Sequence, residues 1–433
     1  MSNILVASSP ASGHVKPMLT IAAHLKSCGH RITFNTDVSF RPQVDALDLT
    51  FVPLFGKAAI DSSHEVFLGR QNVAPGVPQL IYDTQHLFGD PIPDQYLGLR
   101  QITDREDIDI ILADAFFLGV FPYLLGPKES RPPIVSCGVF ALMMQTEEAS
   151  PFAGVDRTPE GRRRNIEHNR QQMEDLAPAS EYINAVLKSC GAPPSPSFYL
   201  NDAYTLPDLL LQCGTRDFDF GLEKTPANMR FVGPIQPPPH SDFEAPAWWN
   251  ELDGSKPIVF VTQGTVANYD FDQLVNPTLA ALAHEDVTVV CTAGGGDVSL
   301  IKTQPNVKLE KYLPYDQVLP KAAVFVTNAG YNGVQQALSM GVPIVAAGAT
   351  EDKPQVSARL AWTGAGIDLQ TGNPTPEQVR DAVRRILAND EYKKRAKLMQ
   401  KSYAQYDALK SIGAAVEEML DKKASLSMAG TTK

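Results

Sequence analysis

A histidine and an aspartate stand at the ends of two predicted strands in the first half of the chain. His14 lies in Gly13-His14-Val15-Lys16-Pro17, just after the apolar run Ile4–Ala7, and Asp114 directly follows the run Asp109–Ala113. A histidine can take a proton from a hydroxyl near neutral pH, and a carboxylate beside it can fix its tautomer and stabilise the imidazolium. The pair therefore predicts a general base with a supporting carboxylate. The structural alternative is that each residue only caps the element after it.

A turn rich in small residues lies in the second half of the chain. The segment Thr327-Asn328-Ala329-Gly330-Tyr331-Asn332-Gly333 follows the predicted strand Val324–Thr327 and opens the predicted helix Gly333–Met340. Small residues let a ligand approach the backbone, and the N–H groups at a helix N-terminus favour an anion. Gln263-Gly264-Thr265, after the predicted strand Ile258–Thr262, can add a hydroxyl and further N–H groups. Together they predict a diphosphate site, although glycine used for steric reasons alone remains an open interpretation.

An acidic segment follows a third predicted strand of this half. Glu351-Asp352-Lys353-Pro354 comes shortly after Ile344–Ala347. A carboxylate held there can accept hydrogen bonds from the hydroxyls of a sugar. Taken alone, the segment is equally consistent with an ordinary acidic helix cap.

The elements that must position these residues follow an α/β order. The strand Ile4–Ala7, the helix Val15–Ser27 and the strand Ile32–Asn35 predict the opening of a doubly wound domain, and the same order restarts at Ile258. The last helices are predicted at 376–388, 391–406 and 411–420, and we expect a disordered tail from Lys423. In such sheets ligands bind at the carboxyl ends of the strands, where all the polar residues above lie.

The length and a proline-rich segment predict two domains. At 433 residues the chain is too long for one core and suits two domains of roughly 200 residues each. Three consecutive prolines at 237–239 cannot continue a helix or a central strand, which indicates a stiff linker. We expect domains over 1–232 and 248–405, a linker over 233–247, and a C-terminal helix and tail over 406–433 that packs back toward the first domain.

Composition excludes several classes of protein. A formal net charge of -11 argues against sequence-independent nucleic-acid binding and gives no attraction to anionic membranes. The five cysteines are scattered without a CxxC pair, and they indicate no metal site. Neither a signal-peptide pattern nor about 18 uninterrupted apolar residues is found, so we expect a cytoplasmic protein without stable membrane insertion. The oligomeric state is not indicated.

Taken together, these segments resemble the family 1 glycosyltransferases, a group of plant, macrolide and fungal enzymes that use UDP-sugars. The resemblance covers nearly the whole chain, points to the microbial and fungal macrolide or phenolic type, and is strongest from Ile258 to Leu369. It implies the GT-B fold, in which two Rossmann-like domains face each other across a cleft. The N-terminal domain would then bind the acceptor and the C-terminal domain the nucleotide-sugar donor.

The donor signature of that family can be laid over this sequence. Tyr312 falls on the uracil-stacking aromatic, and Asp352-Lys353 falls on the sugar-binding Asp-Gln pair. Asn328 replaces a phosphate-binding histidine and Gln336 a ribose-binding glutamate, while Lys353 replaces glutamine, as in some microbial members. The donor-binding residues implied are Gly264, Thr265, Tyr312, Leu313, Asn328, Gly330, Tyr331, Asn332, Gly333, Gln336, Asp352 and Lys353.

The resemblance also implies a reaction. We expect inverting, metal-independent transfer of a hexose, glucose from UDP-glucose, to a hydroxyl of a small hydrophobic or aromatic acceptor such as a flavonoid, phenol, lipid or polyketide. His14 would be the base and Asp114 its supporting carboxylate, with no cofactor beyond the UDP-sugar co-substrate. The polar insertions at 56–100 and 145–200 are expected to shape the acceptor pocket. Its expected lining residues are Phe116, Phe117 and Met143.

Two other functions stay open. One is a non-catalytic nucleotide-sugar-binding subunit that activates a partner, and the other is a nucleotide-sugar epimerase of the same fold. The first has no use for His14 and Asp114, and the second needs no acceptor pocket. Release of UDP with and without an acceptor distinguishes the three.

Overall fold

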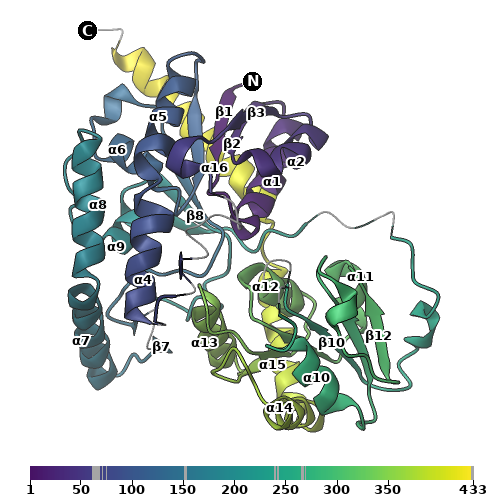
Figure 1. Cartoon of the computed structure of the whole chain (residues 1–433). Coiled ribbons are helices and arrows are strands. Elements are labelled where there is room, and N and C mark those ends of the chain that lie inside the picture. Colours follow the sequence, from purple (N-terminus) through teal and green to yellow (C-terminus); the bar gives the residue numbers. More distant parts are fainter. Residues whose placement is uncertain are drawn as a thin grey trace. The chain divides into compact units, whose positions relative to one another are not determined.

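The chain forms two compact units, which we call the N-terminal unit and the C-terminal unit. The N-terminal unit comprises Met1–Cys213, Glu223–Ile235 and Asp407–Lys433, and the C-terminal unit comprises Gly214–Leu222 and Gln236–Tyr406. The computed structural model (Figure 1) describes residues 1–60, 69–70, 72–74, 76–150, 154–237, 240, 243–264, 268 and 270–430. The segment Gly214–Leu222 belongs to the C-terminal unit. The predicted domain boundary had placed this segment in the first domain.

The N-terminal unit is built on a parallel sheet of seven strands in the order β3-β2-β1-β4-β5-β8-β9. The strand order reverses between β1 and β4, which pair directly with each other. The predicted strands of this half are confirmed to within a residue or two at their ends. They could be predicted because the strands of a parallel sheet are buried on both faces and therefore appear in the sequence as short apolar runs. The strands are β1 (Asn3–Ala7), β2 (Arg31–Thr36), β3 (Thr50–Pro53), β4 (Ile110–Asp114), β5 (Ile134–Gly138), β8 (Leu209–Gln212) and β9 (Met229–Phe231).

Helices connect these strands, and two of the connections are long. The segments predicted as polar insertions contain helices. Among these are the successive helices α7 (Pro159–Asp175) and α8 (Ala177–Ser189) and the π-helical turn η3 (Thr84–Gly89). A small antiparallel pair, β6 (Ala149–Ser150) and β7 (Gly154–Val155), precedes α7. The helical elements are α1 (Ser12–Ser27), α2 (Arg41–Ala46), α4 (Val77–Asp83), η3 (Thr84–Gly89), α5 (Ile92–Thr103), α6 (Phe121–Leu124), α7 (Pro159–Asp175), α8 (Ala177–Ser189) and α9 (Tyr199–Thr205).

The C-terminal unit repeats this arrangement with a parallel sheet of six strands in the order β12-β11-β10-β13-β14-β15. Here the strand order reverses between β10 and β13, and every residue of these two strands is buried. The strands are β10 (Ile258–Thr262), β11 (Thr288–Thr292), β12 (Val307–Glu310), β13 (Val324–Thr327), β14 (Ile344–Ala346) and β15 (Gly366–Asp368). The helices are α10 (Val275–Leu282), α11 (Tyr315–Val318), α12 (Tyr331–Ser339), α13 (Lys353–Thr363), α14 (Pro376–Ala388) and α15 (Asp390–Tyr403).

The last helix, α16 (Ala408–Gly430), belongs to the N-terminal unit and packs against α1 (Figure 1). Nε2 of the buried His30 lies 3.0 Å from Oε1 of Glu417 on this helix. The expectation of a disordered tail from Lys423 is wrong for residues 423–430, because the helix continues to Gly430, and residues 431–433 lie outside the described residues. Nζ of Lys423 donates to the carbonyl oxygen of Asp109 over 3.2 Å, which anchors this turn.

A buried ion pair fixes the segment Gly214–Leu222 within the C-terminal unit. Nε of Arg359 on α13 donates to Oδ1 of Asp219 over 2.8 Å, and the two side chains are 2% and 0% exposed. The guanidinium also lies 4.5 Å from the centre of the Phe220 ring. A buried charge needs a partner that is oppositely charged and hydrogen-bonded to it. The pairing of Arg359 with Asp219 therefore holds this segment against α13.

Substituting Asp219→Asn should destabilise the C-terminal unit by about 3 kcal/mol, because the guanidinium of Arg359 would remain buried without its counter-charge. Urea unfolding followed by tryptophan fluorescence measures this loss selectively. All three tryptophans, Trp248, Trp249 and Trp362, lie in the C-terminal unit.

The matched control removes a carboxylate from the surface of the same unit. Asp381 on α14 is exposed, so Asp381→Asn should change the unfolding free energy by no more than about 0.5 kcal/mol. Equal losses in the two variants would mean that the buried pair adds nothing of its own.

Candidate active site

The structure brings His14 and Asp114 together. His14 lies in the first turn of α1, which follows β1, and Asp114 is the last residue of β4. Because β1 and β4 are adjacent and parallel, their carboxyl ends meet at the same edge, where the strand order reverses and α/β sheets bind ligands. Nδ1 of His14 lies 3.0 Å from Oδ1 of Asp114, and the two side chains are 20% and 0% exposed.

Backbone groups hold the carboxylate of Asp114 in place. The N–H of Ser9 donates to Oδ2 over 2.6 Å, and the N–H of Phe116 donates to Oδ1 over 3.0 Å. Burial by itself raises the pKa of Asp114, but His14 and these two N–H groups outweigh it and hold the pKa below its usual value. An ionised Asp114 makes Nδ1 of His14 the donor, so Nε2 carries the lone pair that can accept a proton. The role of Ser9 was not predicted, since its contribution is a backbone group.

A row of three aromatic rings extends from His14. We define the aromatic row as Phe140, Phe116 and Phe88. The His14 ring lies 5.2 Å from that of Phe140, the rings of Phe140 and Phe116 are 4.7 Å apart, and those of Phe116 and Phe88 are 5.0 Å apart. Phe140 and Phe116 are buried, whereas Phe88, on the π-helical turn η3, is half-buried. π-Helical turns are frequent at functional sites. Sequence reasoning missed Phe88, because the apolar residues around it carry no distinct spacing.

The other two predicted acceptor residues have different surroundings. The side chain of Phe117 is fully buried in the core of the N-terminal unit, so it cannot contact an acceptor and the expectation for it is corrected. Met143 is half-buried, and its N–H donates to the hydroxyl of Tyr204 over 3.0 Å. Met143 therefore remains a candidate.

In the C-terminal unit the turns after β10 and β13 contact each other. Nδ2 of Asn328, just after β13, donates to the carbonyl oxygen of Gln263, just after β10, over 2.6 Å. These strands flank the reversal of strand order, as β1 and β4 do in the other unit. Gly264 follows with a positive φ of 76°, a conformation that favours glycine. Thr265 lies outside the described residues.

The turn between β13 and α12 is strained at one residue. Ala329 is buried and has a φ of 64°, in the left-handed region that non-glycine residues rarely adopt. Such strain, of order 1–3 kcal/mol, is concentrated at ligand-binding segments. Gly330 is the N-cap residue of α12, and Asn332 and Gly333 lie in the first turn of this helix. The N–H groups of this turn are suited to a diphosphate.

Two predicted donor residues are buried in packing. The ring of Tyr331 is 4% exposed and lies 5.9 Å from that of Phe218. Leu313 is 1% exposed and belongs to the core. A contact of either residue with the donor would therefore come from its backbone, and both stay predicted donor residues. Tyr312, by contrast, is 53% exposed and can accept a stacked base, and Gln336 lies half-buried on α12.

The acidic segment after β14 contains a buried lysine. Nζ of Lys353 donates to Oγ1 of Thr350 over 3.2 Å and also forms an ion pair with the carboxylate of Glu351. A Cβ on Gly348 would lie 2.3 Å from the carbonyl oxygen of Asn328 and 2.7 Å from Cβ of Lys353, so this segment packs closely against the turn after β13. Asp352 is the N-cap residue of α13.

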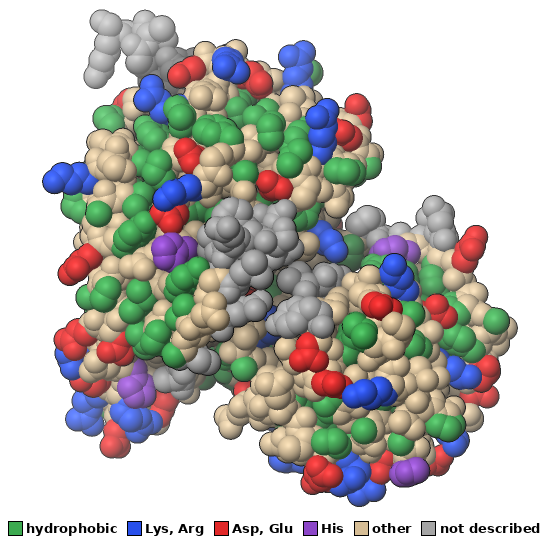
Figure 2. All heavy atoms as spheres, viewed as in Figure 1, with side chains coloured by type: hydrophobic (Ala, Val, Ile, Leu, Met, Phe, Trp, Pro, Cys, Tyr) green, Lys and Arg blue, Asp and Glu red, His purple; other side chains and the backbone are tan. Residues whose placement is uncertain are grey.

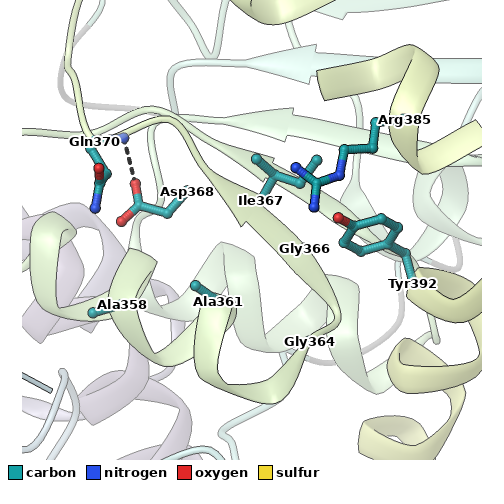
Figure 3. A pocket seen from close by; sticks show the side chains of 9 residues that line it. All are labelled: Ala358, Ala361, Gly364, Gly366, Ile367, Asp368, Gln370, Arg385 and Tyr392. Carbon is teal, nitrogen blue, oxygen red and sulfur yellow. Dashed lines mark hydrogen bonds between the residues drawn. The ribbon is translucent and has the colours of Figure 1, made fainter. Parts of the chain in front are cut away.

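A cavity elsewhere in the C-terminal unit is separate from these residues. It has a volume of about 520 Å³ and lies among α13, α14, α15 and the edge strand β15 (Figure 3). The N–H of Gln370 donates to Oδ1 of Asp368 over 2.8 Å, and burial raises the pKa of Asp368. None of the predicted site residues lines this cavity, and we do not include it in the site.

Surface charge, candidate metal ligands and helix hydropathy add further observations. Acidic and basic side chains are interspersed on the face drawn in Figure 2. Among the residues that the structure describes, no group of three or more His, Cys, Asp or Glu side chains is placed to hold a metal ion. Asp270-Phe271-Asp272 has the spacing of an Asp-x-Asp motif, but Oδ1 of Asp272 binds Nζ of Lys302 over 2.9 Å. No helix in the described part of the chain is long and apolar enough to cross a membrane.

The known proteins that are similar to this chain are glycosyltransferases. A family model described as UDP-glucoronosyl and UDP-glucosyl transferase matches residues 201–416. The chain is 33% identical to UDP-glycosyltransferase 2 of Phaeomoniella chlamydospora, covering 96% of this chain and 95% of that protein. It is 32% identical to UDP-glucosyltransferase B1 of Starmerella bombicola, covering 96% and 98%. The crystal structure of the glycotransferase of kitacinnamycin has a TM-score of 0.72 at 20% identity, covering 96% and 98%, which confirms the predicted GT-B fold.

Proposed function

This chain belongs to the UDP-glucoronosyl and UDP-glucosyl transferase family, and we propose that it transfers glucose from UDP-glucose to a small hydrophobic or aromatic acceptor. It is a UDP-glycosyltransferase that acts on small molecules. We further propose that transfer proceeds with inversion and needs no metal ion. The contact of 3.0 Å between His14 and Asp114 carries this proposal, because it supplies an oriented base where a hydroxyl must be activated.

The proposed reaction is a direct displacement. Nε2 of His14 takes the proton of the acceptor hydroxyl as its oxygen attacks C1 of the sugar. The bond between C1 and the diphosphate oxygen breaks, UDP leaves with the electron pair, and the proton remains on His14. Asp114 stabilises the imidazolium formed in this step. Attack from the side opposite the leaving group inverts C1, so an α-linked donor gives a β-glycoside.

The C-terminal unit would hold the donor. The N–H groups at the start of α12, together with Gly264 and Asn328, would stabilise the negative charge that develops on the diphosphate. Uracil would stack on the exposed ring of Tyr312, Gln336 would bind the ribose, and Asp352 would accept hydrogen bonds from the sugar hydroxyls. The 32% identical relative that is named a UDP-glucosyltransferase supports glucose as the sugar.

The aromatic row supports an aromatic or apolar acceptor. Its three rings extend from the proposed base, and Phe88 at the far end is the most exposed of them. An acceptor with its hydroxyl at His14 could place its apolar part against this row. Aromatic pairs contribute about 0.5–1.5 kcal/mol beyond the area that they bury.

Substituting Phe88→Ala should raise the KM for an aromatic acceptor roughly three- to tenfold, because one ring contact is lost. The kcat and the KM for UDP-glucose should stay near their original values. Initial rates measured over a matrix of donor and acceptor concentrations give all three constants.

Phe55→Ala is the matched control for this variant. Phe55 is an exposed aromatic residue of the same unit, outside the aromatic row. An acceptor KM that rises equally in both variants, or in neither, would exclude Phe88 from the acceptor site.

The proposed function is tested by UDP release from UDP-glucose, with a panel of flavonoid, phenol, sterol and hydroxy-fatty-acid acceptors and an excess of chelator. We expect release that depends on the acceptor and survives the chelator. Tight UDP binding without release would favour the activator-subunit alternative, and conversion of UDP-glucose without an acceptor would favour the epimerase. Release that stops on chelation would contradict the metal-independent mechanism.

A further inference from the structure

We propose that Glu351 makes the donor site selective for uncharged hexoses, because it neutralises Lys353 and so disfavours UDP-sugars whose sugar carries a carboxylate. The discriminated donor classes are UDP-glucose and UDP-glucuronate, the two sugars to which the family description refers. The inference rests on the proposed donor site and identifies a specificity residue within it.

The position of Lys353 carries the first step. Its side chain is buried beside the turn after β13, with Gly348 held between its Cβ and the carbonyl of Asn328. A lone buried ammonium at this place would attract an anionic sugar. In the structure this ammonium contacts the hydroxyl of Thr350 and the carboxylate of Glu351.

The charges of this segment carry the second step. Glu351 and Asp352 supply two carboxylates and Lys353 one ammonium, so the segment has a net charge of -1. Hydroxyls of an uncharged hexose can donate to the carboxylates and accept from the ammonium. The carboxylate of a uronate meets a net repulsion instead, and it competes with Glu351 for the ammonium.

The backbone of Glu351 is an independent observation. Its φ of 55° lies in the left-handed region, which favours glycine and which other residues rarely adopt. Its side chain is 55% exposed, so packing does not explain why this residue occupies a strained position. A role for the carboxylate in the site accounts for it.

The substitution Glu351→Gln tests the inference, since it removes the charge while the size and the backbone strain stay nearly the same. Isothermal titration calorimetry on the full chain gives dissociation constants for UDP, UDP-glucose and UDP-glucuronate. We expect UDP-glucuronate to bind about fivefold more tightly relative to UDP-glucose, the effect expected for unit charges about 4 Å apart that water screens, since the side chain of Glu351 is 55% exposed. The affinity for UDP should not change.

Two further variants make the result specific. The double variant Glu351→Gln/Lys353→Gln should lose the gain, because the ammonium is absent. Glu244→Gln, at an exposed carboxylate of the same unit, should leave the ratio as it is. An unchanged ratio in Glu351→Gln, an equal gain in Glu244→Gln, or a gain that persists in the double variant would overturn the inference.

Binding and transfer fail in different ways. Tight UDP-sugar binding without transfer to any acceptor would refute the proposed transfer and leave the binding ratios as a valid test of Glu351. Failure of UDP and both UDP-sugars to bind the unaltered chain would overturn the donor site, and with it both proposals.

Discussion

Replacing His14 with alanine should lower kcat by ~10²–10⁴, the range lost when a positioned general base is removed. In the proposed reaction, this variant lacks the positioned base that takes the proton of the acceptor hydroxyl. The affinity for UDP should stay close to that of the unaltered chain, because the proposed donor contacts come from the other unit. Steady-state rates with saturating acceptor and UDP calorimetry on the same preparation measure the two quantities.

His24 provides the control on the same helix. Both histidines lie on α1, so His24→Ala and His14→Ala change the helix propensity of α1 in the same way. His24→Ala leaves the pair His14 and Asp114 unaltered. We expect the kcat of the His24 variant to remain within about twofold of the original. Parallel losses of kcat and UDP affinity in His14→Ala would show damage to the fold rather than loss of a base.

Asp114→Asn should also reduce kcat by ~10²–10⁴, although the side chain keeps its size. The amide cannot stabilise the imidazolium as a carboxylate does, and it can present an N–H to Nδ1 of His14 and favour the wrong tautomer. Because the carboxylate favours the protonated form of His14, its loss should move the acidic limb of the kcat/KM profile to lower pH. A purely structural role of Asp114 would lower the rate without moving this limb.

The double variant His14→Ala/Asp114→Asn separates the pair from two independent residues. Side chains that act as a unit are strongly non-additive, so the double variant should be about as slow as His14→Ala alone. Multiplied losses would mean that Asp114 acts on the rate by a route other than His14.

Sequence patterns alone predicted most of the strands and the sheet edge at which the candidate site lies. The strands Ile258–Thr262 and Val324–Thr327 were predicted with the bounds that the structure has, because buried parallel strands read as unbroken apolar runs. Polar residues after such runs must lie at the carboxyl edge of the sheet, and this geometric rule alone placed His14 and Asp114 close together. The structure adds the distance of 3.0 Å between their side chains.

Tertiary structure decided which side chains of each turn are accessible. Leu313 and Tyr331 sit in donor-signature positions, yet the first is in the core and the second packs on Phe218. Phe117 is fully buried, whereas Phe88 of the aromatic row is half-buried. Neighbouring residues in a turn can point in opposite directions, and their burial depends on elements distant in the sequence.

Long-range pairing also decided where Gly214–Leu222 and Lys353 belong. The segment lies in the C-terminal unit because Asp219 meets Arg359, 140 residues further along the chain. Lys353 is buried next to Asn328 because β13 and β14 are neighbours in the sheet. Hydrophobic periodicity and turn residues reflect interactions between residues that are close in the sequence. They therefore predict the helices and strands and where these end. Ion pairs and burial are set by the order in which strands pair, and local pattern does not encode this order.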